Sequence, residues 1–94
     1  MLTKCYESKV LIDGKDVSGW SECFLTKDDD ESPPRYFASV PNSREVRDAL
    51  MSEADVRLEL RGGQVLHLAD FSHTSDDDLM VTCGLRYTSD PPPF

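Results

Sequence analysis

The stretch KVLIDGKDV, residues 9–17, is the strongest indication of the fold class. Its central Asp-Gly pair lies between two segments rich in β-branched residues. Both middle positions of a two-residue hairpin turn require a positive φ, which aspartate tolerates and glycine favours. We therefore predict a hairpin with Asp13 and Gly14 at the turn and with Val10 opposite Val17.

Further strands are expected on both sides of a charged loop. The second strand of the hairpin is expected to continue from Val17 through Trp20 to Leu25, with Gly19 as a bulge or a point of close packing, because glycine weakens a strand interior. Residues 27–34 carry four adjacent carboxylates and two prolines, which favour an exposed loop. A short strand is predicted at residues 36–40.

One short helix is predicted over residues 43–52. Asn42 is the expected N-cap, and Glu45 lies three residues further on, as in a capping box. At under three turns this helix is not stable alone, so it must pack on the sheet. Its apolar face consists of Val46, Ala49 and Leu50.

Apolar residues then alternate with charged ones over residues 56–60, which is typical of a half-buried strand. Gly62-Gly63 turns the chain. A two-residue loop would put the leucines that follow on the opposite face from Leu60. A three-residue loop through Gln64 places Leu60 opposite Leu66 and unites the leucines on one face, so we favour that loop.

The remainder of the chain holds an acidic loop at residues 72–78 and a final strand whose alternating positions run from Leu79 to Tyr87. Five or six short strands with one short helix predict an α+β, mostly β fold: a small antiparallel sheet or partly open barrel. Residues 1–88 are expected to form this single domain. Residues 89–94 contain three prolines and are expected to form an extended tail.

The chain is strongly acidic, with a net charge of −8 over 94 residues. Its ten basic residues are scattered singly, so direct binding to nucleic acid is not expected, and the same field repels anionic membranes. The longest apolar run, Val10–Ile12, is far shorter than a membrane span, and early charges argue against a secretory signal. We expect a cytoplasmic protein whose partner is another protein with a basic surface.

The residue types that serve catalysis or metal binding lack the spacing that such sites require. Three widely spaced cysteines, Cys5, Cys23 and Cys83, favour reduced thiols, although Cys5 and Cys23 could face each other across a hairpin. His67 and His73 form no known zinc or calcium pattern with their neighbours, and no nucleophile motif occurs. We therefore predict no enzymatic activity, no metal site and no cofactor.

Two hypotheses for function follow. The candidate partner-binding residues are two acidic runs and one aromatic residue: Asp28, Asp29, Asp30, Glu31, Asp76, Asp77, Asp78 and Trp20. In the first hypothesis, the carboxylates form one acidic surface that docks on a basic, nucleic-acid-binding site of a partner. Phage inhibitors of host nucleases or of CRISPR complexes share this general profile. The simpler interpretation is that the charges only keep the loops soluble and that Trp20 fills the core.

In the second hypothesis, the chain is a small structural or assembly module of a larger complex or phage particle. Its contacts would then come from edge strands and from a surface that contains Leu66 and Leu68. A homo-oligomer is compatible with this hypothesis as well as with the first.

Overall fold

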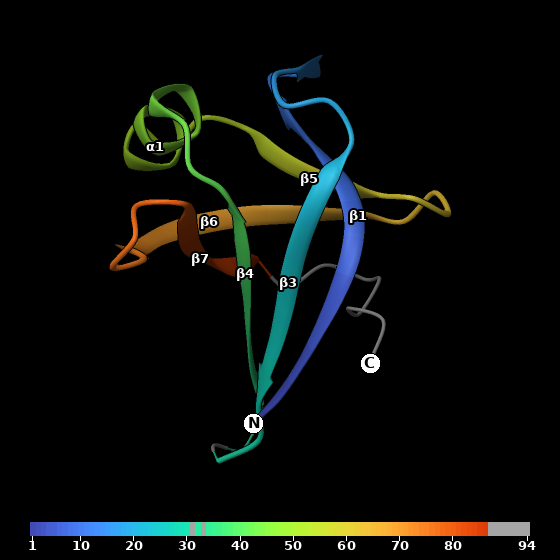
Figure 1. Ribbon diagram of the computed structural model, residues 1–94, viewed down its shortest axis with the longest axis vertical. Coiled ribbons are helices and arrows are strands. Elements are labelled where there is room, and N and C mark those ends of the chain that lie inside the picture. The colour runs from blue at the N-terminus through green and yellow to red at the C-terminus, as the bar shows by residue number, and fades with distance from the viewer. Residues whose placement is uncertain (31, 33, 87–94) are drawn as a thin grey trace.

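The computed structural model describes residues 1–30, 32 and 34–86 and shows a small closed barrel (Figure 1). Its elements are β1 (Leu2–Ile12), β2 (Lys15–Asp16), β3 (Ser21–Asp28), β4 (Arg35–Pro41), α1 (Arg44–Met51), β5 (Val56–Leu60), β6 (Val65–Thr74) and β7 (Met80–Arg86). The strands pair antiparallel in the order β2-β1-β3-β4-β7-β6-β5, and β5 pairs back to β1. The predicted mostly β fold with one short helix is confirmed, and the barrel is closed rather than partly open.

Closure depends on β1, which is long enough to pair with both β3 and β5 in addition to the short β2. Residues Leu2–Ser8 pair with β3, whereas Ser8–Ile12 pair with β5. A strand that crosses the barrel in this way removes the open edges that a flat sheet of the same strands would leave.

Among the described residues, no helix is long and apolar enough to span a membrane.

The Asp-Gly hairpin has the predicted geometry. Asp13 and Gly14 both have positive φ, 51° and 84°, and the backbone N–H of Val17 donates to the Val10 carbonyl at 3.0 Å. The strand that follows is not continuous, because β2 ends at Asp16. β3 then begins at Ser21 with the pairing to β1 shifted by two residues.

The helix begins one residue later than predicted. Ser43 is the N-cap, and its hydroxyl accepts a hydrogen bond from the Val46 N–H at 3.1 Å. Asn42 instead donates its side-chain amide to the Asp78 carbonyl at 2.8 Å, and this contact draws it out of the capping position. The predicted apolar face is confirmed, since Val46 is buried with its two neighbours on that face, and α1 packs mainly on β6.

The loop between β5 and β6 has the predicted length but lies one residue earlier. Its three residues are 61–63, so Leu60 faces Gln64 through an N–H···O bond of 2.8 Å, and Leu58 faces Leu66. The predicted register of Leu60 opposite Leu66 is therefore wrong by two positions. A shift of two preserves the face of every side chain, which is why the leucines still lie together.

The final hairpin also differs from the prediction. β6 extends to Thr74, with register irregularities on both sides of Phe71, and the loop shortens to residues 75–79. Leu79 belongs to this loop and is 66% exposed. Tyr87 and the expected tail at 89–94 lie outside the described residues.

One cluster of side chains fills the barrel and continues under α1. It consists of Val10, Cys23, Leu25, Ala38, Val40, Val46, Ala49, Leu50, Val56, Leu58, Leu60, Leu66, Leu68, Val81 and Cys83. Leu66 and Leu68 are only 3% and 4% exposed. They cannot form the contact surface that the assembly hypothesis assigned to them.

Candidate functional site

The first acidic run lies in the connection between β3 and β4. Asp28 is the last residue of β3, and its carboxylate accepts a hydrogen bond from the Asp30 N–H at 3.0 Å. Asp29 pairs with Lys27 at 3.5 Å, and both Asp29 and Asp30 are exposed. Glu31 lies outside the described residues. This run therefore contributes two exposed carboxylates beside one lysine.

The second acidic run forms a tightly hydrogen-bonded loop between β6 and β7. The Asp77 carboxylate accepts bonds from the Ser75 hydroxyl at 2.6 Å and from the Leu79 N–H at 3.1 Å. These bonds, the one from Ser75 first, hold the pKa of Asp77 below its usual value. Asp77 thus orders the loop, while Asp76 and Asp78 are exposed.

The two acidic loops do not meet. The first leads into the start of β4 at Arg35, whereas the second lies at the other end of β4, where the Asn42 N–H donates to the Leu79 carbonyl. Seven residues of strand, at about 3.3 Å each, separate them by roughly 20 Å. In Figure 1 the first loop lies at the bottom of the barrel near the N-terminus, and the second, in orange, lies at the left.

Carboxylates outside the two acidic runs are spread around the barrel. Glu22 lies on β3 directly opposite Glu7 on β1. This is the only pair of facing acidic residues in the β1–β3 ladder. Asp55 is paired with Arg57 at 3.2 Å. Glu53 and Asp70 each have a positive φ, in the connection before β5 and in the middle of β6. The single continuous acidic surface is therefore replaced by separate patches.

Trp20 does not fill the core, since it is 45% exposed. Two cations contact its ring, with the Lys9 Nζ 4.9 Å and the Arg61 Cζ 4.6 Å from the ring centroid. Glu59 pairs with Lys9 at 3.2 Å, and Glu7 pairs with Arg61. Exposed cation–π contacts contribute about 0.5–1 kcal/mol each, so the ring is held in place while part of it stays accessible.

A short hydrogen-bonded segment explains how Trp20 reaches this position. The Asp16 carboxylate accepts bonds from the Ser18 N–H at 3.1 Å and the Gly19 N–H at 2.8 Å. These bonds, with Gly19 first, lower the pKa of Asp16. The Ser18 hydroxyl accepts from the Val10 N–H at 2.8 Å, and Gly19 has a φ of 66°. The segment between β2 and β3 therefore accounts for the two-residue shift in the pairing with β1. It also turns Trp20 outward, as β-bulges do for functional side chains.

Two of the three cysteines are buried, and the exposed one lies apart from them. Burial raises the pKa of the Cys83 thiol to about 12, with the Asp70 carboxylate adding to the effect, and burial also raises the pKa of Cys23. Cys5 is exposed and faces Phe24 rather than Cys23, so the two thiols lie on opposite sides of the sheet. No three His, Cys, Asp or Glu side chains in residues 1–30, 32 and 34–86 could together hold a metal ion.

A cleft of about 870 Å³ is lined by residues from the start of β4, the middle of β6 and the end of β7. Its walls include Tyr36, Phe37, Phe71, Leu85, Arg35 and Asp70. The Arg35 guanidinium lies 5.5 Å from the centroid of the Phe37 ring. Mainly aromatic and aliphatic walls suit packing against a segment of another molecule.

Comparisons with protein-family models, with curated proteins and with solved structures find no match to this chain.

Proposed function

We propose that this domain is a non-enzymatic protein-binding module, an inhibitor or adaptor, that presents acidic loops to a basic site on a partner protein in the cytoplasm. The observation that carries the proposal is the construction of the β6–β7 loop in a chain of net charge −8. One aspartate, Asp77, fixes the loop through Ser75 and Leu79, and its neighbours Asp76 and Asp78 stay exposed. Carboxylates on an ordered loop lose little conformational freedom on binding, which favours affinity.

The partner site that we propose is one that binds nucleic acid, as expected of a phage-type anti-defence or anti-CRISPR inhibitor. The distance between the two acidic loops, roughly 20 Å, equals about six nucleotide steps of 3.4 Å along one DNA strand. Two carboxylate groups at that separation would replace two phosphate groups in a basic groove. The net charge of −8 supports a protein partner rather than nucleic acid itself.

The test is affinity capture from a nuclease-treated lysate of the native cells, with washes at low and moderate salt. The loop variant carries Asp29→Lys and Asp30→Lys in the first acidic loop, and a second variant, Asp76→Lys, tests the β6–β7 loop. The control carries Glu45→Lys and Glu53→Lys, which make the same change in net charge as the loop variant at exposed positions in and after α1. Since Glu53 already has a positive φ, its replacement adds no new backbone strain.

We expect the wild type and the control to retain a basic nucleic-acid-binding protein that the loop variant loses, and we expect the wash at higher salt to release it. Equal loss in the loop variant and the control would show that only total charge matters. Recovery of a partner that neither salt nor any variant releases would reject the acidic-loop function and favour an assembly module.

A further inference from the structure

The outward face of β1, β3, β4 and β7 carries uncharged side chains around Phe24, and the Arg35 guanidinium lies over the Phe37 ring at one end of it. The register of the strands places its side chains in rows, with Phe24 between Cys5 and Ser39 and with Thr82 beyond Ser39. We name the β4 face by six of its residues, Cys5, Phe24, Thr26, Phe37, Ser39 and Thr82. In a chain that is 30% charged, a surface of this kind across four strands is unexpected if it only faces water.

The polar groups of the β4 face are already hydrogen-bonded to one another. The hydroxyls of Thr3 and Thr26 are 3.1 Å apart, and those of Ser39 and Thr82 are 2.9 Å apart. A hydroxyl that keeps its hydrogen bond costs little to remove from water, whereas an unpaired one costs much more. Phe24 is 37% exposed between these two pairs, and aromatic residues are enriched among the residues that dominate binding.

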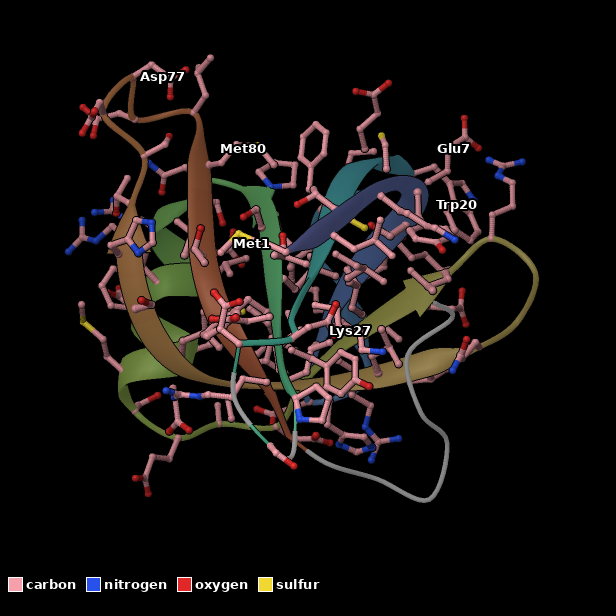
Figure 2. The ribbon with its side chains drawn as sticks, turned by 90° about the horizontal axis from the view of Figure 1, so that it is seen from below. Met1, Glu7, Trp20, Lys27, Asp77 and Met80 are labelled. Atoms are coloured by element: carbon pink, nitrogen blue, oxygen red, sulfur yellow. The ribbon has the colours of Figure 1, made fainter. Side chains whose placement is uncertain are left out.

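Acidic groups lie at several margins of this face, and two cations, Arg35 and Lys27, lie at the margin beside the first acidic loop. Glu7 and Glu22 face each other directly at one margin, and Arg61 pairs with Glu7, which offsets part of the repulsion between the two carboxylates. The two acidic loops lie beyond the two ends of β4. Figure 2 shows Asp77, Met80 and Glu7 along the same side of the molecule, which places the second loop and the Glu7 margin around one surface.

The size of the face indicates what covers it. Four strands about 4.8 Å apart and about 20 Å long give an area of about 400 Å². A standard interface takes about 800 Å² from each partner, so a stable complex must also include the acidic margins. A second copy of this chain would bring acidic margins against acidic margins, whereas a partner with an apolar centre and a basic rim would match both parts.

We propose that the β4 face is the docking surface for a partner protein that offers an apolar centre surrounded by basic residues. This inference rests on the proposed function and names the surface through which it acts. The acidic loops then steer the partner and bind its rim, while Phe24 provides the central contact.

The experiment uses the basic protein recovered in the capture described above and measures its affinity for three forms of the whole chain. Phe24→Thr removes the ring and keeps a β-branched residue. Met51→Gln is the control, because Met51 is 63% exposed on α1, away from this face. The third form is the wild type with a bulky maleimide on Cys5, which is the exposed thiol beside Phe24.

We expect the affinity of Phe24→Thr and of the Cys5 adduct for the partner to fall by about tenfold or more relative to the wild type. The affinity of the Met51→Gln control should change by at most about twofold. Unchanged binding by both altered forms, together with loss of binding in the loop variant, would overturn the docking surface and leave the proposed function intact. If no salt-sensitive basic protein is captured, both proposals are rejected. A wild-type dimer that Phe24→Thr dissociates would identify a second copy as the occupant and would also overturn the inference.

Discussion

Replacing Ser18 with alanine tests how the chain turns Trp20 outward. The Ser18 hydroxyl accepts the N–H of Val10 at 2.8 Å, and Val10 is only 1% exposed. Without that acceptor the N–H is buried and unpaired, which costs about 1–3 kcal/mol. For a domain of this size, each kcal/mol lowers the Tm by about 4–8 °C, so we expect a decrease of about 8–16 °C for a loss near 2 kcal/mol.

Thermal unfolding followed by circular dichroism measures this decrease, and fluorescence of Trp20, the sole tryptophan, reports on the local change. We expect the emission of Ser18→Ala to shift to the red as the segment loosens. Asp16→Asn is the matched control, because an amide oxygen can still accept the N–H groups of Ser18 and Gly19. A decrease in Tm of less than about 2 °C for Ser18→Ala would show that the Ser18 hydroxyl is not needed by the Val10 N–H, because a change of that size is within the range of an ordinary surface substitution.

Three further predictions concern the core, the thiols and the acidic loop. Leu58→Ala empties a fully buried position and should cost about 2–5 kcal/mol in the free energy of urea unfolding, whereas Leu79→Ala should change it by under about 0.5 kcal/mol. A thiol reagent at pH 8 should modify Cys5 rapidly and Cys83 about a thousandfold more slowly until the protein unfolds, because the pKa of Cys83 is raised to about 12. Equal rates in the native protein would contradict this. The pKa of Asp77 is lowered from 3.8, so its stabilising effect is complete above that pH and is lost as the pH falls through the folded-state value. Asp77→Asn should therefore flatten the acid dependence of Tm below about pH 4, and an unchanged profile would count against the hydrogen bonds from Ser75 and Leu79.

Local signals in the sequence were sufficient for the hairpin turn and the buried face of the helix. Asp13 and Gly14 adopt positive φ because the turn requires it, and this requirement depends on neighbouring residues only. The face of each leucine near the β5–β6 loop was also predictable, because alternation survives a shift of two residues. The N-cap residue was not predictable from local sequence, because Asn42 is drawn away by a contact with Asp78, 36 positions along the chain.

Closure of the barrel and the arrangement of the candidate site depend on pairing between distant residues. Nothing in the composition of β1 shows that it bends to pair with both β3 and β5. The acidic loops were visible as charge runs, but their separation follows from their places at the two ends of β4. The β4 face combines side chains from Thr3 to Thr82 and becomes apparent only when the register of four strands is known.

The most direct test of the central claim is the salt dependence of binding between this domain and its captured partner. We would measure the dissociation constant by calorimetry at several salt concentrations between about 50 and 200 mM, for the wild type and for the variant with Asp29→Lys and Asp30→Lys. We expect the wild-type affinity to fall steeply as salt rises and the variant to bind more weakly with a shallower slope. Wild-type affinity that does not change with salt, or a variant with the same slope as the wild type, would contradict this claim.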